Sequence, residues 1–172
     1  IEDVEFTHRT ASRLESVDAA QSAWVHRMLV GANAPIEKLA LFWHGHFATS
    51  VRKVEKAKLM MGQIDLFREK GTGPFGELLE GVARDPAMIA WLDGNLNRRG
   101  KPNENFAREL FELFALGIGH YTEADNKEAA RASPGWHARE GHFWFNERAH
   151  DADVKTVFGR SGPFGGEDVL RL

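Results

Sequence analysis

The sequence contains no cysteine, which excludes disulfide bonds, thiolate metal ligands and a cysteine nucleophile. It also lacks any apolar run approaching the roughly 20 residues of a membrane-spanning helix. An excess of positive charge is missing too, because 22 basic residues face 25 acidic ones and the formal net charge is -3. We therefore expect no membrane span and no general surface for nucleic acid.

The start of the chain has no basic segment followed by an apolar one, so no signal peptide is recognisable. We expect the initial Ile1 to reflect processing or excision from a longer chain. The 172 residues, 42% of them hydrophobic and 27% charged, suit one globular domain with its own core. We expect a single domain over residues 1–172, helical over 18–133 and hairpin or irregular over 136–172.

Apolar residues spaced three and four apart, with capping residues at the ends, predict a mainly α, multi-helix globular domain. The expected helices cover residues 18–30, 35–49, 52–70, 75–83, 86–92, 103–116 and 123–132. The C-terminal part differs, because the β-prone runs 142–145 and 156–158 flank a polar stretch as the strands of a hairpin would. The fold class is therefore mainly α with a small C-terminal β-hairpin.

Two histidines in the second expected helix form the first candidate site. Positions two apart on a helix point about 200° from one another, so His44 and His46 cannot both bind one metal ion from this helix. His46 shares the face of Trp43 and is the candidate metal ligand. The alternative for a buried histidine is an imidazole hydrogen-bonded within the core.

The expected helix from Asn103 carries the second candidate site. Glu104, Arg108 and Glu112 form an i, i+4 row that an ordinary series of ion pairs would explain. Glu109 lies at the edge of the apolar face, where desolvation would raise its pKa toward that of a general acid. Glu109 and Glu104 are thus the candidate acid and base.

The glycine-hinged loop 117–125 carries the third candidate site. It holds four side chains suited to acid, base or metal-ligand chemistry: His120, Tyr121, Glu123 and Asp125. Oxygens of Glu123, Asp125, Asn126 and Glu128 could hold Ca²⁺, although the glycine and spacing of an EF-hand loop are missing. The alternative is structural, with Thr122 capping the next helix and both carboxylates in its first turn.

Two further groups add polar and aromatic side chains. His150, Asp151 and Lys155 at an expected turn either complete a site built by distant helices or cap the hairpin. Trp136 has the kind of surface that stacks on sugar rings, although a tryptophan in a domain of this size is commonly part of the core. The candidate substrate-binding residues are Trp43, Asn103, Arg108 and Trp136.

Five sequence blocks, in this order, resemble those of the bacterial family called domain of unknown function 1800. They are WHGHF at 43–47, NENFARELFELF at 103–114, LGIGHYTEAD at 116–125, ARA and GW within 130–136, and HD and KT within 150–156. The resemblance covers about residues 35–172 and implies a central portion of a longer, exported protein, hence a periplasmic or extracellular location. The chain departs from the blocks at Ser133-Pro134, where Phe-Thr is usual, and at Asn126, where Val is common.

These patterns lead us to expect a hydrolase of glycosidic or ester bonds acting on a carbohydrate or ester substrate. Glu109 or Glu104 would be acid or base, and His46 and His120 would be partners or ligands of a divalent metal ion such as Ca²⁺ or Zn²⁺. The alternatives are a non-catalytic structural module and a carbohydrate-binding module of an exported bacterial assembly. The sequence leaves the substrate and the oligomeric state open.

Overall fold

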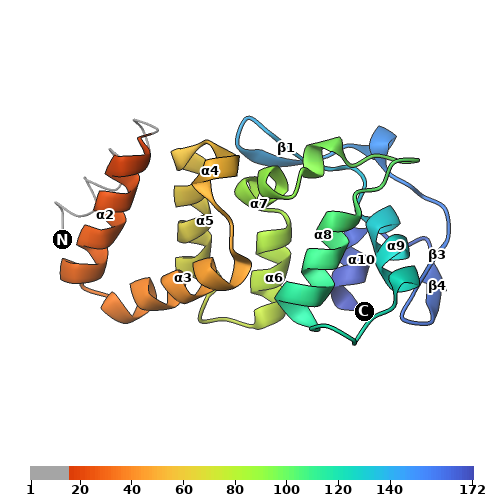
Figure 1. Cartoon of the computed structure of the whole chain (residues 1–172), viewed down its shortest axis with the longest axis horizontal. Helices are drawn as coiled ribbons and strands as arrows, with labels where there is room; N and C mark the ends of the chain where they lie inside the picture. The colour runs from red at the N-terminus through yellow and green to blue at the C-terminus, as the bar shows by residue number, and fades with distance from the viewer. Residues whose placement is uncertain (1–15) are drawn as a thin grey trace. The chain divides into compact units, whose positions relative to one another are not determined.

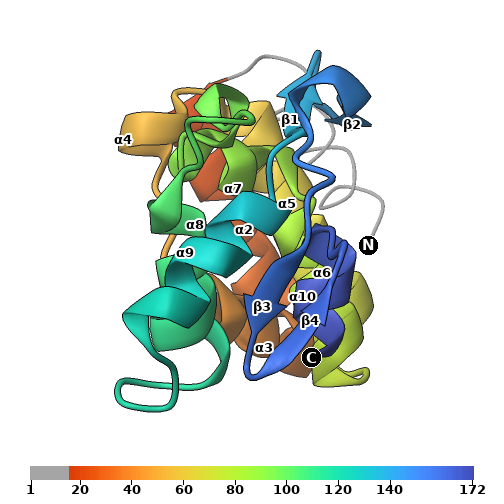
Figure 2. The same ribbon diagram turned by 90° about the vertical axis from the view of Figure 1, so that its right-hand side faces the viewer.

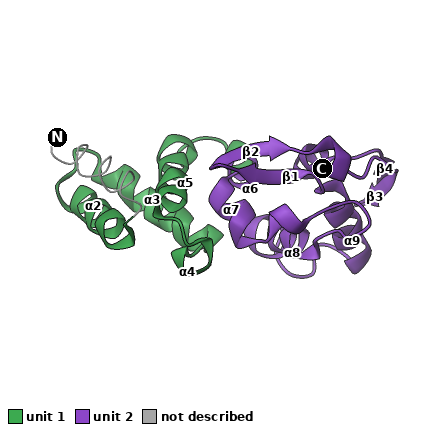
Figure 3. Ribbon diagram, turned by 90° about the horizontal axis from the view of Figure 1, so that it is seen from above, with its two compact units in different colours: residues 1–78 green, residues 79–172 purple. Residues whose placement is uncertain are grey.

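Helices dominate the computed structural model, which describes residues 16–172 and confirms the predicted mainly α fold (Figure 1). Ile1 therefore lies outside the described residues. Two short hairpins lie in the C-terminal part of the chain, before its last helix. The internal contacts divide the chain into two compact units, residues 1–78 and 79–172, coloured separately in Figure 3. Within the described part, no helix is both long and apolar enough to cross a bilayer.

The described residues of unit 1 form four helices and the beginning of a fifth. They are α2 (Val17–Val30), α3 (Ala34–Phe47), α4 (Val51–Val54), α5 (Ala57–Lys70) and α6 (Phe75–Ala83), which runs on into unit 2. Ser16 caps α2 by accepting a hydrogen bond from Ala19 N, so the helix begins one residue before the expected start at residue 18. The expected helix 52–70 is interrupted because Glu55 adopts a left-handed conformation at φ 59°, which ends α4.

The core of unit 1 forms where α5 packs against α3 and α2. The Phe47 and Phe67 rings stack with centroids 5.7 Å apart, and both side chains are buried. Ala23 and Met61 bury a second contact between α2 and α5. These helices are held mainly by apolar burial, which favours the folded state by about 25 cal/mol for each Å² removed from water.

Unit 2 combines short helices with two separate hairpins. Its helical segments are α7 (Pro86–Trp91), η1 (Gly94–Leu96), α8 (Glu104–Glu109), η2 (Leu110–Ala115), α9 (Glu123–Ala132), η3 (Glu147–Ala149) and α10 (Gly166–Arg171). The expected α-helix 103–116 changes to a π-helix at Leu110. The wider turn is visible where Leu116 N donates to Phe111 O, five residues back, at 2.9 Å.

The hairpins pair strands that are neighbours in sequence. β1 (Trp136–Arg139) pairs with β2 (His142–Phe145), and β3 (Lys155–Val157) pairs with β4 (Arg160–Gly162), both antiparallel (Figure 2). The predicted pairing of runs 142–145 and 156–158 with each other is wrong. The run 142–145 follows the two-residue turn 140–141, and the run 156–158 ends in the two-residue turn 158–159. Both residues of each turn have positive φ. Such turns join adjacent strands directly, so each run acquires a partner of its own.

Candidate functional site

The densest group of predicted site residues in unit 2 lies along α8, η2 and the start of α9. We call it the α8–α9 cluster and define it as Arg108, Glu109, Glu112, Tyr121 and Glu123. The Tyr121 hydroxyl donates a hydrogen bond to Glu112 Oε2 at 2.8 Å. The Arg108 guanidinium donates to both carboxylate oxygens of Glu123, at 2.8 and 3.0 Å. A planar guanidinium favours this two-bond geometry, which fixes the start of α9 beside α8.

Glu109 differs from the other carboxylates of the cluster. Burial raises its pKa, and the nearby Glu112 charge raises it further. No hydrogen bond or ion pair joins the Glu109 carboxyl group to another residue of the described part of the chain. Glu109 therefore keeps its proton to a higher pH than an ordinary glutamate, in the direction expected from its place at the edge of an apolar face.

Glu112 is the member of the cluster whose role the sequence did not indicate. Its expected place in an i, i+4 row with Arg108 is wrong, because Arg108 pairs closely with Glu123 and Glu112 bonds to Tyr121. The π-helix begins at Leu110, between the two residues, and turns Glu112 out of that row. The hydrogen bond to Glu112 raises the pKa of Tyr121, so the phenol holds its proton and remains a donor.

The loop residues proposed as metal ligands have structural partners. The hydrogen bond from Arg108 lowers the pKa of Glu123. Asp125 Oδ2 accepts from Thr122 N at 2.9 Å in a capping box, and Asp125 Oδ1 accepts from Phe158 N at 2.7 Å. The capping interpretation of Thr122 is therefore confirmed. Among residues 16–172, no three or more His, Asp or Glu side chains are grouped so as to hold a metal ion.

Other predicted residues of unit 2 serve the fold or face solvent. Asn103 caps α8 by accepting from Asn105 N at 3.0 Å, and its amide donates to Leu92 O at 2.6 Å. Asn103 and the half-exposed Glu104 line a polar surface hollow of about 400 Å³. His120 is exposed in the loop.

Trp136 belongs to the core of unit 2. It is 6% exposed, and its ring packs against Phe106 and Phe143 at centroid distances of 6.0 and 5.8 Å. A Cβ at Gly166 would lie 2.5 Å from the Trp136 ring, so glycine is needed there for the start of α10 to approach the indole. Trp136 therefore offers little surface for a sugar ring.

Two predicted residues, Trp43 and His46, belong to unit 1. Trp43 Nε1 donates to Gly71 O at 3.0 Å, which ties α3 to the end of α5. The His46 ring lies among aromatic neighbours, with centroids 5.7 Å from Trp43 and 4.9 Å from Phe47. Both residues thus take part in the packing of their own unit.

The predicted turn at 150–155 contains a largely buried polar network. Arg131 Nε donates to Asp151 Oδ2 at 3.0 Å, and Arg131 Nη1 bonds to Glu128. Lys155, only 1% exposed, donates to the backbone carbonyls of Asp151 and Asp153. Burial lowers the pKa of Lys155. We call these residues, Glu128, Arg131, Asp151 and Lys155, the α9–loop network; it fastens the loop before β3 to α9.

Comparison with known proteins gives one match. A sequence model of a family described as protein of unknown function (DUF1800) matches residues 5–172. The matched range includes all five sequence blocks and extends further toward the N-terminus than the resemblance drawn from those blocks. Neither the curated proteins nor the solved structures gave a match.

Proposed function

The chain belongs to the DUF1800 family, and we propose that its α8–α9 cluster hydrolyses glycosidic or ester bonds with Glu109 and Glu112 as an acid–base pair. The observation that carries this proposal is the contrast between the two carboxyl groups. Burial and the Glu112 charge raise the pKa of Glu109, whereas Glu112 accepts a hydrogen bond from Tyr121. Cleavage by acid–base catalysis requires one protonated and one ionised carboxyl group at the same site.

Each residue of the cluster receives a role from its contacts. Glu109 gives its proton to the leaving oxygen of the substrate, and the Glu112 carboxylate accepts a proton from the attacking water. Tyr121 holds Glu112 in place through its hydroxyl. We assign the acid to Glu109 instead of Glu104, because the Glu104 side chain is 43% exposed and faces the Arg108 charge at 3.9 Å. These roles require no metal ion.

The π-helix supports placing the reaction here. π-Helical turns are rare and occur frequently at functional sites, since they change the direction of side chains at some cost in backbone hydrogen bonding. In this chain the π-helix begins at Leu110 and directs Glu112 toward Tyr121.

We further propose a periplasmic or extracellular site of action, because the resemblance to the family implies export.

The test is an activity screen with chromogenic glycosides, esters and lactones, followed by variants of any activity found. We expect Glu109→Gln to lower kcat at least about 100-fold, the usual contribution of a general acid. Glu112→Gln should have a comparable effect, and Tyr121→Phe should lower kcat less, because it removes only the hydrogen bond that holds Glu112 in place. Glu147→Gln, at an exposed position of the same unit, is the matched control. Unchanged turnover in Glu109→Gln would remove this residue from the mechanism.

A second candidate function is a non-catalytic module of an exported assembly, and the α9–loop network favours it. Charged side chains of Arg131 and Asp151 are bonded to each other, and Lys155 is bonded to backbone carbonyls. Such a network holds a segment in one arrangement without chemistry. A blank activity screen, together with a large loss of stability in Asp151→Asn, would support this candidate against the hydrolase.

A carbohydrate-binding surface would have to use Trp144 in place of the buried Trp136. Trp144 is 46% exposed on β2, and its ring lies 5.8 Å from that of His137. An exposed indole beside a second ring is a suitable platform for a sugar. Glycan-array binding that is lost in Trp144→Ala would support this function, and silence of the folded protein on the array would count against it.

A further inference from the structure

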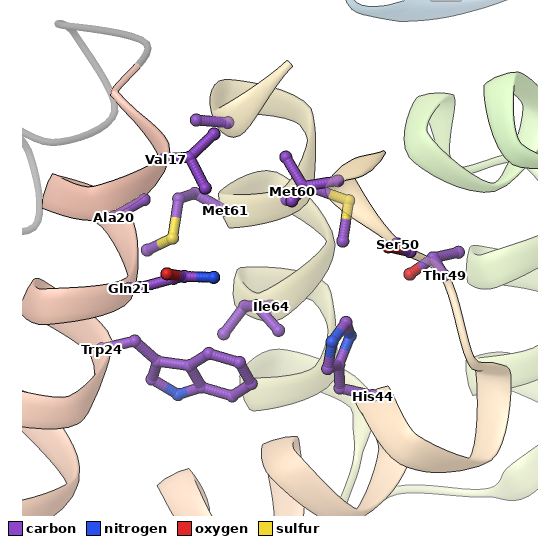
Figure 4. Close-up of a pocket in the computed structure, with 12 residues that line it drawn as sticks. Val17, Ala20, Gln21, Trp24, His44, Thr49, Ser50, Met60, Met61 and Ile64 are labelled. Atoms are coloured by element: carbon purple, nitrogen blue, oxygen red, sulfur yellow. The ribbon is translucent and has the colours of Figure 1, made fainter. Parts of the chain in front are cut away.

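A hollow of about 190 Å³ lies inside unit 1, between α2, α3 and α5 (Figure 4). It is lined by Val17, Ala20, Gln21, Trp24, His44, Thr49, Ser50, Val51, Ala57, Met60, Met61 and Ile64. We propose that this hollow binds a neutral aromatic alcohol of about the size of phenol, with the His44 imidazole as its hydrogen-bonding partner. The inference concerns unit 1 and is independent of the hydrolysis proposed for unit 2.

The volume of the hollow suits a single ring. A dry apolar cavity of about 150 Å³ is large enough to bind benzene. The hollow in unit 1 therefore has space for one six-membered ring with one or two small substituents. It is smaller than the roughly 300–1,000 Å³ of pockets that take drug-sized molecules.

The lining favours an aromatic and uncharged ligand. The Trp24 and His44 rings project toward the same space in Figure 4, with centroids 5.6 Å apart and an edge-on arrangement. Met60 and Met61 supply thioethers, which adapt to ligand shape and make favourable contacts with aromatic rings. Among the described residues, no Asp, Glu, Lys or Arg lines the hollow. A charged ligand would lose its hydration there without gaining an opposite charge.

His44 differs from two histidines whose rings have backbone partners. His137 Nε2 lies 3.2 Å from Asn97 O, and His150 Nδ1 lies 3.1 Å from Pro134 O. His44 Nδ1, in contrast, is buried and has no hydrogen-bond partner within the described residues, and a ligand in the hollow reaches this nitrogen only after the imidazole turns. Burial lowers the pKa of His44, so its ring is neutral and offers one donor and one acceptor. A hydroxyl group both donates and accepts, and it therefore suits either tautomer of the imidazole.

The methionines provide a direct test, because the chain has only four. Met60 and Met61 line the hollow, whereas Met28 lies elsewhere on α2 and Met88 is fully buried in unit 2. In methyl NMR spectra of the full chain labelled with ¹³C at methionine, phenol should shift the Met60 and Met61 signals saturably. The Met28 and Met88 signals serve as internal controls and should remain in place.

Toluene and 1-hexanol separate the two parts of the proposal. Toluene keeps the ring without the hydroxyl, and we expect it to bind about tenfold more weakly, the value of one hydrogen bond. 1-Hexanol keeps the hydroxyl without the ring and should bind more weakly than phenol. Equal affinity for phenol and toluene would overturn the role of the hydroxyl, and equal affinity for phenol and 1-hexanol would overturn the aromatic assignment.

Two variants make the test independent of one substitution. His44→Leu should bind toluene but lose the preference for phenol, whereas His26→Leu, at an exposed position of α2, should keep that preference. Ala20→Leu fills the hollow from α2 and should abolish binding of both probes, with an unchanged Met28 signal as the sign that α2 and unit 1 remain folded. The proposal fails if saturating phenol leaves Met60 and Met61 unshifted, or if His44→Leu still prefers phenol.

Discussion

Glu37 and Arg68 form a buried ion pair in unit 1, in which Arg68 Nη2 lies 2.8 Å from Glu37 Oε2. Glu37 is only 2% exposed, and it also accepts hydrogen bonds from Arg27 Nε at 2.6 Å and from Trp24 Nε1 at 3.1 Å. One carboxylate of α3 thus joins α2 and α5. A buried charge with several partners contributes little net stability compared with an apolar core, but removing one partner leaves the rest uncompensated.

The first prediction concerns this carboxylate. Glu37→Gln should lower the free energy of unfolding of unit 1 by about 3 kcal/mol, because Arg27 loses its counter-charge and Arg68 keeps the exposed Asp65 but loses its buried partner. Urea unfolding of both proteins measures the difference. Glu69→Gln, at an exposed position of α5, should leave the transition unchanged. A loss in Glu37→Gln no larger than in this control would show that the pair does not hold the helices.

The pH dependence of unit 1 gives the second prediction. Burial alone would raise the pKa of Glu37, but the hydrogen bonds and charges of Arg68 and Arg27 outweigh it and hold the pKa below its usual 4.5. The stabilisation is therefore complete above pH 4.5 and is lost as the pH falls through the lower, folded-state pKa. The Met60 and Met61 signals should report unfolding of unit 1 on acidification. Glu37→Gln should weaken this dependence; an identical pH profile in the variant would contradict the assignment.

The third prediction concerns Asn126 in α9. Its side chain is fully buried, and neither its amide nitrogen nor its amide oxygen has a hydrogen-bond partner within the described residues. A buried amide without partners costs about 1–3 kcal/mol. Asn126→Val, the residue common in the family block, should therefore raise the unfolding midpoint in urea. Asn105→Val, at an exposed site of α8, should change it little, and destabilisation by Asn126→Val would contradict the prediction.

The fourth prediction separates the capping role of Asp125 at the start of α9 from its hydrogen bond with Phe158 N. Thr122→Ala removes one half of the capping box and should cost about 1 kcal/mol. Asp125→Ala removes the other half and also the acceptor of Phe158 N, so its effect should be larger. Thermal unfolding of both variants gives the comparison. Equal losses would mean that the bond to Phe158 N contributes nothing to stability.

The sequence predicted helices best where capping signals are local. The ranges 75–83 and 123–132 agree with α6 and α9, the latter because Thr122 and Asp125 define the start of that helix by themselves. The break at Glu55 has no such signal, because positive φ is uncommon for glutamate and nothing in the residue type indicates it. The turns at 140–141 and 158–159 each contain a glycine, a signal that could have indicated two hairpins instead of one.

The candidate sites also combine features that helical periodicity predicts with features that depend on tertiary packing. The position of Glu109 at an apolar edge follows from helical periodicity, and its raised pKa agrees with that position. The partnership of Glu112 with Tyr121 depends on the π-helix, which periodicity does not reveal. Helical periodicity places His44 on the face opposite His46, but the hollow beside His44 exists only because α2 and α5 leave space there. Tertiary packing, rather than residue type, creates that feature.

The two hairpins of unit 2 form two separate sheets of two strands each. A lone two-stranded hairpin is barely stable in water. The β3–β4 pair relies on α9, whose Glu128 accepts from Thr156 N at 3.1 Å and whose Asp125 accepts from Phe158 N. This ribbon therefore cannot be transplanted to another scaffold without α9, and evolutionary exchange or engineering of the segment would have to move the helix and the ribbon together.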